Sequence, residues 1–103
     1  MLLRVIRTRV EKDRWREFEE GVLADETDVQ NISGLRARWL IRDIDDSDAG
    51  FIIVIWDSEA DTLGFERDSR RHKLLTKPLP GEFEFHLCEI RSSWIAPNAT
   101  YPR

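Results

Sequence analysis

The sequence has few of the residues that build disulfide frameworks or metal sites. Its 103 residues include one cysteine, Cys88, and two histidines, His72 and His86, all in separate parts of the chain. A single cysteine excludes an internal disulfide, and these three residues do not form a recognisable metal-binding motif. We therefore expect no bound metal and, by default, a reducing, cytoplasmic setting.

Long apolar runs and a net positive charge are also absent. The apolar run at 51–56 is far shorter than the roughly 20 residues that a membrane-spanning helix needs. The N-terminal residues alternate with arginines, which is not typical of a signal peptide. A net charge of −4 and a pI of about 5.2 disfavour nucleic acid and anionic membranes as partners.

What is present is typical of one globular domain. Hydrophobic residues make up 41% of the chain and charged residues 35%, which argues against disorder. We expect one domain over residues 1–93. The remaining residues, 94–103, include two prolines and show little periodicity, so they are predicted to form an irregular tail.

Hydrophobic periodicity predicts six elements in the order βαββαβ. Alternating or continuous apolar residues indicate strands over 2–10, 35–44, 51–56 and 82–94. A 3.6-residue period indicates helices over 11–31 and from 59 to about 75, the second starting after a Ser58–Asp61 cap. This order predicts an α+β, ferredoxin-like fold with a four-stranded antiparallel sheet and two helices.

The third predicted strand is apolar on both of its faces. Phe51, Ile53 and Ile55 lie on one face, whereas Ile52, Val54 and Trp56 lie on the other. Two helices can cover one face of a four-stranded sheet, and no third helix is predicted for the other. An uncovered apolar face of that size is unusual in a monomer. We therefore predict a homodimer in which the open sheet faces of two copies pack together.

The segment "IVIWDSEADTL", followed by "DSRRHK", resembles the antibiotic biosynthesis monooxygenase family. Trp56, Ser58, Leu63 and Ser69 occupy positions where that family carries an aromatic residue, a cap, an apolar residue and a serine. The resemblance covers residues 2–92 and implies a dimeric α+β barrel. It also implies a small-molecule substrate, because members oxygenate aromatic polyketides and quinols without a cofactor or degrade haem, while others have no known activity.

The residues of the polyketide oxygenases are not carried over. Those enzymes use an Asn, a Trp and a Tyr, whereas here the asparagines are Asn31 and Asn98 and the single tyrosine is Tyr101.

The haem-degrading pattern is not carried over either. That branch uses an Asn on the first strand, where this chain offers Arg7 and Arg9. The helix tryptophan of that branch corresponds to Phe65 or Glu66, and His72 comes about one helical turn too early for the haem ligand. We therefore expect no cofactor.

The second predicted helix carries cations on a stripe where apolar residues are expected. Gly64, Arg67 and Arg71 share this stripe, and the glycine leaves room for a bound group. One interpretation is a substrate pocket between this helix and the sheet, with Arg67 or Arg71 stabilising an enolate or phenolate oxygen. The alternative is that both arginines pair with neighbouring carboxylates.

The two histidines are the candidate catalytic bases. His72 follows Asp68 by four residues on a stripe shared with Phe65, a spacing that favours a more basic imidazole. His86 lies in the middle of the last strand. Either could remove a phenolic or C–H proton, as cofactor-free oxygenation requires. The alternatives are a solvated helix-end His72 and a structural His86.

Three further residues are candidates for substrate binding. Trp39 and Trp56 could wall an aromatic pocket, or either could belong to the core. Arg38 could bind an anionic substrate, or it could form salt bridges within the sheet or across a dimer.

Taken with these candidate residues, the resemblance implies a cofactor-independent monooxygenase for a small aromatic, polyketide or quinol-like substrate. Two alternatives remain open. One is a small-molecule isomerase or lyase on the same barrel, and the other is a non-catalytic, ligand-binding dimeric module.

Overall fold

The computed structural model describes residues 1–24, 31–67 and 81–99, with the backbone alone described for 64–67. The elements are β1 (Leu2–Val10), α1 (Trp15–Ala24), β2 (Leu35–Arg42), β3 (Ala49–Trp56), α3 (Glu59–Arg67) and β4 (Gly81–Glu89). All neighbouring strands are antiparallel, in the order β2-β3-β1-β4. The predicted ferredoxin-like α+β fold is confirmed.

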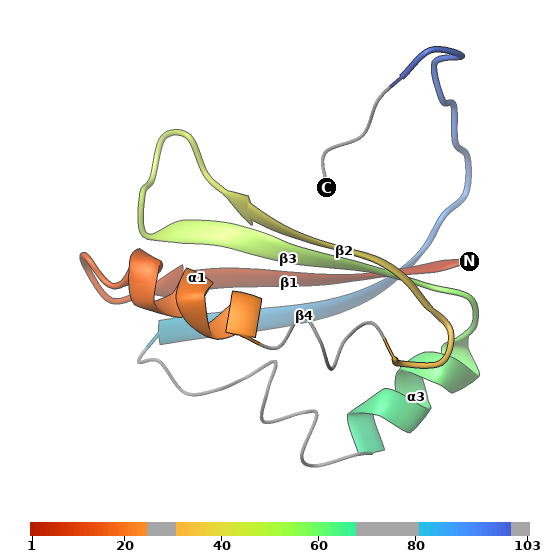
Figure 1. The fold of residues 1–103 in the computed structure, drawn as a ribbon, viewed down its shortest axis with the longest axis horizontal. Coiled ribbons are helices and arrows are strands. Elements are labelled where there is room, and N and C mark those ends of the chain that lie inside the picture. The colour runs from red at the N-terminus through yellow and green to blue at the C-terminus, as the bar shows by residue number, and fades with distance from the viewer. Residues whose placement is uncertain (25–30, 68–80, 100–103) are drawn as a thin grey trace.

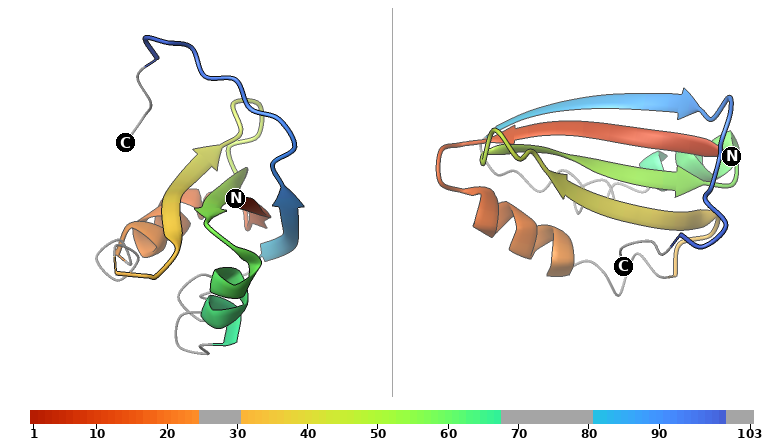
Figure 2. Two further views of the ribbon diagram at one scale, coloured as in Figure 1. Left: turned by 90° about the vertical axis from the view of Figure 1, so that its right-hand side faces the viewer. Right: turned by 90° about the horizontal axis from the view of Figure 1, so that it is seen from above.

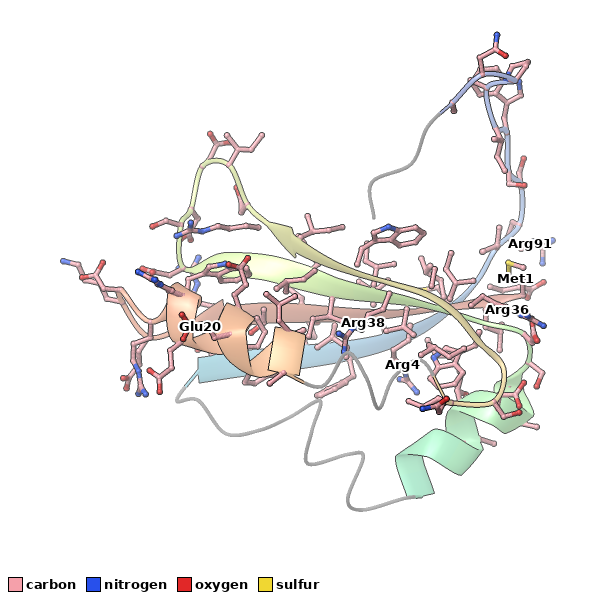
Figure 3. The ribbon with its side chains drawn as sticks, in the orientation of Figure 1. Met1, Arg4, Glu20, Arg36, Arg38 and Arg91 are labelled. Atoms are coloured by element: carbon pink, nitrogen blue, oxygen red, sulfur yellow. The ribbon has the colours of Figure 1, made fainter. Side chains whose placement is uncertain are left out.

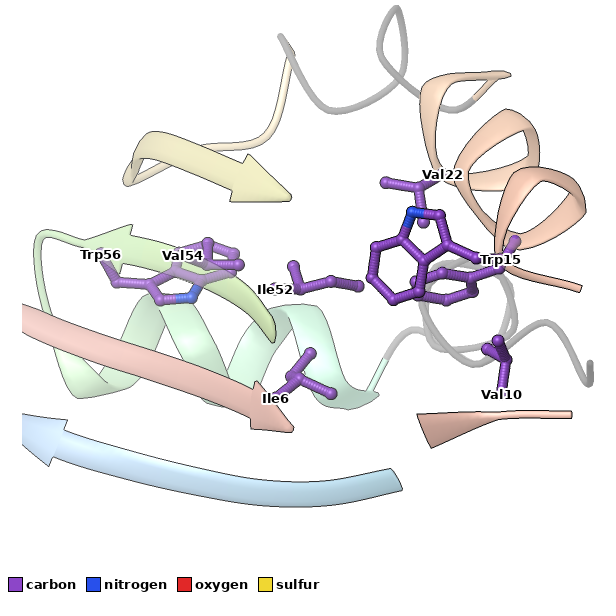
Figure 4. Close-up of a cluster of buried hydrophobic side chains, with 8 residues drawn as sticks. Ile6, Val10, Trp15, Val22, Ile52, Val54 and Trp56 are labelled. Atoms are coloured by element: carbon purple, nitrogen blue, oxygen red, sulfur yellow. The ribbon is translucent and has the colours of Figure 1, made fainter. Parts of the chain in front are cut away.

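The two described helices, α1 and α3, lie on the same side of the sheet (Figures 1 and 2). We call this side the helix side and the opposite side the open face. The core sits on the helix side, where α1 packs on the sheet (Figure 4). It comprises Ile6, Val10, Trp15, Phe18, Val22, Ile52, Val54 and Trp56. The helical period of the sequence places Trp15, Phe18, Val22 and Val29 on one apolar stripe. The first three are buried in the structure, as that stripe predicts, and Val29 falls outside the described residues.

Some element boundaries differ from the prediction. The first strand has the predicted bounds, but α1 begins at Trp15 rather than at residue 11. Asp13 has a positive φ of 63°, which an α-helix cannot contain, so the chain turns before the helix starts. β4 ends at Glu89 rather than at 94, and residues 90–99 form no helix or strand.

The cap predicted for the second helix is present. The Asp61 backbone N–H donates to Ser58 Oγ at 3.3 Å, and the Ser58 hydroxyl donates to Asp61 Oδ2 at 2.8 Å. One of the otherwise unpaired N–H groups at the start of α3 is thereby satisfied. The cap fixes where β3 ends and α3 turns beneath the sheet.

The register of β2 contains an irregularity. Leu35 pairs with Trp56 and Ala37 pairs with Ile55, so Arg36 is an extra residue at this point. The alternation of Leu35, Ala37, Trp39 and Ile41 in the sequence predicts that they share one face. This is wrong for Leu35, because the extra residue turns it to the helix side, where it packs on the core.

The extra residue itself forms an ion pair. Arg36 Nε and Nη2 donate to Asp57 Oδ1 and Oδ2 at 2.6 and 2.5 Å. This hydrogen-bonded partner lowers the pKa of the Asp57 carboxyl below its usual value. The bidentate pair joins the start of β2 to the residue that follows β3.

Gly50 allows β2, β3 and α1 to approach one another. A Cβ atom at this position would lie 2.1 Å from the Ile41 carbonyl oxygen and 2.5 Å from the Trp15 ring. Any side chain here would displace either the neighbouring strand or the indole. The absence of a side chain therefore allows Trp15, the largest core residue of α1, to pack closely against β3.

Two fully buried threonines differ in their hydrogen bonding, and we expect substitution by valine to change the free energy of unfolding in opposite directions at the two positions. Thr62 Oγ1 donates to the Glu59 carbonyl at 2.8 Å, whereas Thr8 Oγ1 has no hydrogen-bond partner in the described part of the chain. Thr8→Val should raise the free energy of unfolding by about 1 kcal/mol, and Thr62→Val should lower it by about 1 kcal/mol. Urea denaturation of both variants measures the difference; equal losses in the two would mean that the Thr8 hydroxyl has a partner.

Candidate functional site

The helix side carries a row of residues that crosses the whole sheet and contains two arginines. Arg38 of β2 pairs with Val54 of β3, Val54 pairs with Arg4 of β1, and Arg4 pairs with Leu87 of β4. Because neighbouring strands are about 4.8 Å apart, the two arginine Cα atoms lie roughly 10 Å apart. Both side chains project to the helix side (Figure 3).

Arg38 joins the sheet to the end of α1. Its Nη2 donates to the Val22 carbonyl oxygen at 3.3 Å, in the last turn of the helix. A cation at this end of a helix is favourable because the carbonyl groups there carry partial negative charge. This contact orients the Arg38 guanidinium beneath the sheet, where it is half-buried.

Arg4 lies between the sheet and α3 (Figure 3). It is half-buried, and burial lowers the pKa of its guanidinium from the usual value. A guanidinium remains protonated at neutral pH even so. The helix side therefore holds two partly desolvated positive charges in one row, one toward each helix.

An apolar surface lies beside Arg4. On β4, Phe85 and Leu87 face the helix side in the rows of Ile6 and Arg4, and they are 42% and 39% exposed. Trp56 and Val54 are buried in the same face, nearer the centre of the sheet. Exposed apolar side chains in the row of a half-buried arginine and in the next row suit a ligand that has both an apolar body and an anionic group.

The predicted residues of the second helix are only partly placed. The structure describes only the backbone of Gly64, Phe65 and Arg67, which belong to α3. Arg71 and His72 lie outside the described residues. Their proposed roles in stabilising an anion and removing a proton thus remain predictions.

His86 lies on the open face, away from both helices. It pairs in register with Val5, and its Nε2 is 3.1 Å from Glu84 Oε1. The ring is about half exposed. Since α3 is on the opposite side, His86 and the α3 arginine Arg67 do not share a site within one chain.

The two candidate tryptophans are on opposite faces of the sheet. Trp56 is buried in the helix-side core, whereas Trp39 pairs with Ile53 and faces the open side. They therefore do not wall one pocket together within a single chain. Trp56 stays close to the arginine row, and Trp39 belongs to the apolar open face.

The sequence pattern did not predict the group formed by Arg4, Phe85 and Leu87. One signal was available, because Arg4 interrupts the stripe Leu2, Ile6, Thr8 of the first strand, where apolar residues predominate. The proximity of Phe85 and Leu87 to that arginine depends on the pairing of the first strand with the last, which no local pattern encodes.

A hollow of about 360 Å³ opens where β1 ends and β4 begins. Its lining is Arg7, Thr8, Arg9, Ala49, Glu82, Phe83 and Glu84. The charges alternate in sign across the two strands, since Arg7 pairs in register with Glu84 and Arg9 with Glu82, and Arg9 also forms an ion pair with Asp46. With its acids and bases matched, this hollow offers no unbalanced charge to a ligand.

Within 1–24, 31–67 and 81–99, no group of three or more His, Cys, Asp or Glu residues is arranged to hold a metal ion. Among the helices described, none is long and apolar enough to cross a membrane.

Solved structures of other proteins share this fold. A proposed antibiotic biosynthesis monooxygenase from Deinococcus radiodurans has a TM-score of 0.79 at 9% identity and covers 93% of this chain and 98% of its own. MhuD, a haem degrader from Mycobacterium tuberculosis whose structure has two haems in its active site, has a TM-score of 0.76 at 13% identity, over 91% and 99% of the two chains. A mutant of SnoaB, a cofactor-independent oxygenase from Streptomyces nogalater, has a TM-score of 0.72 at 18% identity, over 89% and 94%.

No protein-family model and no curated protein matches this sequence. The structural likenesses, at 9% to 18% identity, establish the fold and not the activity. The resemblance to antibiotic biosynthesis monooxygenases that the sequence indicates is thus confirmed in its fold.

Proposed function

We propose that this protein is a cofactor-independent monooxygenase that binds a small aromatic, polyketide or quinol-like substrate on the helix side of its sheet. The observation that carries the proposal is the arginine row, which places Arg4 and Arg38 on the same face of the sheet as the exposed side chains of Phe85 and Leu87, with Leu87 the register partner of Arg4. Oxygenation without a cofactor needs an electron-rich, deprotonated substrate, and cations next to an aromatic surface stabilise such an anion.

The proposed chemistry oxidises an activated CH₂ group to a carbonyl. His72 removes a proton, and Arg67 or Arg71 holds the resulting enolate or phenolate oxygen. The carbanion then donates electrons to dioxygen and forms a C–O bond, giving a hydroperoxide. Loss of water leaves the carbonyl, so one oxygen atom enters the product, the other leaves as water, and the substrate supplies all four electrons.

We also propose that the functional unit is a homodimer in the cytoplasm. The open face presents half-buried apolar side chains from three neighbouring strands, including Val5, Trp39 and Ile53, in one register row. Covering this surface stabilises association at about 25 cal/mol per Å² of apolar area. In such a dimer His86 would lie in the interface, so its use as the base would place the chemistry between the two copies.

A haem-dependent activity fits the residues poorly. The haem-degrading branch uses a polar residue on the first strand, for which this chain offers Arg7 and Arg9. These two arginines lie in the open-face rows of β1 and not on the helix side. The resemblance therefore favours the cofactor-free branch, and we derive no haem chemistry for this chain.

Oxygen consumption tests the proposal. Purified protein is mixed with a panel of anthrones and hydroquinones, and dioxygen uptake is followed together with product formation. We expect uptake equal to product formed, and a loss of at least about 100-fold in His72→Ala, the size typical of removing a general base. Conversion of a panel compound without oxygen uptake would support the isomerase or lyase alternative, and binding without conversion would support the non-catalytic module.

A further inference from the structure

We infer that Arg4 and Arg38 form a subsite for the carboxylate, sulfonate or phenolate group of an amphipathic aromatic anion whose apolar body lies against Phe85 and Leu87. This inference rests on the proposed function for the location of the site and goes beyond it by specifying an anionic substrate. It depends on three features of the described residues: register, partial burial and the chemistry of the β4 edge.

The register places the two cations on either side of one buried residue. Arg38 and Arg4 are the partners of Val54 in the two neighbouring strands, so both start from the same row of the sheet and the same face. An arginine side chain reaches about 6 Å beyond its Cβ atom, which allows two guanidinium groups starting about 10 Å apart to contact a single anion. Guanidinium is the side-chain group best suited to bidentate contacts with a carboxylate.

Partial burial strengthens this arrangement. Both arginines are half-buried, in contrast to Arg7 and Arg36, which are exposed. Charge interactions are stronger where water is partly excluded. An anion on the helix side therefore gains more from Arg4 and Arg38 than it would from an exposed arginine.

The β4 edge supplies the apolar half of the subsite. Leu87 is the register partner of Arg4, and Phe85 is the partner of Ile6 in the next row. These side chains lie on the same face as the two arginines, yet each is more than a third exposed, whereas Ile6 and Val54 in the same two rows are buried. A flat aromatic body placed on them would bury apolar area next to the cations.

Fluorescent probes of matched shape test the inference without any turnover. 8-Anilinonaphthalene-1-sulfonate carries the anion, and N-phenyl-1-naphthylamine is its neutral counterpart. In titrations of the native protein at low salt, the sulfonate should bind at least tenfold more tightly than the neutral probe. Arg4→Gln and Arg38→Gln should each weaken the affinity for the sulfonate about tenfold, which corresponds to one charge-assisted hydrogen bond. Neither should change the affinity for the neutral probe.

The same strands offer matched controls. Arg7→Gln changes an arginine on the open face of β1, and Arg36→Gln changes an exposed arginine of β2 that is ion-paired with Asp57. Neither should alter sulfonate binding by more than twofold. Equal losses in Arg4→Gln and Arg7→Gln, or unchanged binding in Arg4→Gln, would overturn the inference.

A competition experiment on the unaltered protein covers the case in which a variant fails to fold. 2-Naphthoate should displace the bound sulfonate, whereas 2-naphthylmethanol, which has a similar shape but no charge, should not at tenfold higher concentration. Equal displacement by both compounds would overturn the inference. Since these measurements need no dioxygen, a protein that binds anions but consumes no oxygen would contradict the proposed function and leave the subsite standing.

Discussion

Ile53→Glu is expected to convert the proposed dimer to a monomer at micromolar concentration. Ile53 is central in the open face, with Trp39 and Val5 as its register partners on the two neighbouring strands. A two-fold dimer would bury two glutamates in an apolar interface, at a cost of several kcal/mol. The dissociation constant should rise on the order of a thousandfold or more. Sedimentation velocity on the wild-type protein and the variant measures the change.

Ile44→Glu is the matched control. Ile44 is 99% exposed, outside the sheet in the connection between β2 and β3, so the same substitution adds the same charge away from the open face. It should leave the sedimentation coefficient unchanged. If wild-type protein already sediments as a monomer at micromolar concentration, a second copy of the chain does not cover the open face, and the proposed dimeric barrel is wrong.

Ile52→Ala, one residue earlier, is expected to reduce the free energy of unfolding by about 3 to 4 kcal/mol. Ile52 is 0% exposed, faces the helix side, and belongs to the core cluster with Ile6 and Val54. Removing three carbon atoms there loses their transfer free energy and leaves a cavity that the sheet cannot close. A loss of this size is a large fraction of the 5 to 15 kcal/mol typical of a small domain.

Urea denaturation of Ile52→Ala and Ile44→Ala measures the effect, with an unchanged m-value expected for both. The exposed control should lose less than about 0.5 kcal/mol. A loss below about 1 kcal/mol in Ile52→Ala would mean that the helix side is not tightly packed at this residue. Ile52→Ala therefore tests the helix-side face of β3 through the free energy of unfolding, and Ile53→Glu tests its open face through the dissociation constant of the proposed dimer.

Much of this fold can be predicted from local patterns. The alternation in the first strand predicts its bounds and the residues on each of its faces, because successive side chains of a strand point to opposite faces of the sheet. The Ser58–Asp61 pair likewise marks the start of α3, because a hydroxyl three residues before an N–H is the geometry of a cap. The start of α1 could not be predicted in this way, since the positive φ of Asp13 belongs to a turn held in part by a hydrogen bond from Asp13 N–H to Asp48 on a distant loop.

The candidate site was less accessible to sequence reasoning. Arg38 was identified as a candidate because it lies in a strand rich in arginines, but its neighbour Arg4 comes from a strand 34 residues away in sequence and meets it only through Val54. Trp39 and Trp56 appeared equivalent as aromatic residues, yet the register puts them on opposite faces. Residue type can be read locally, whereas which residues share a face across four strands depends on long-range pairing.

The extra residue in β2 gives the sheet a tolerance to changes in chain length. Leu35 already faces the helix side and Ala37 the open face, so a relative lacking Arg36 would have an uninterrupted alternation with every other side chain of β2 directed as it is here. Such a shortened protein would lose only the ion pair between Arg36 and Asp57 and the local twist that the additional residue introduces. Among distant homologues, gaps and insertions should therefore accumulate at this point of the strand, while the residues that follow it keep their spacing.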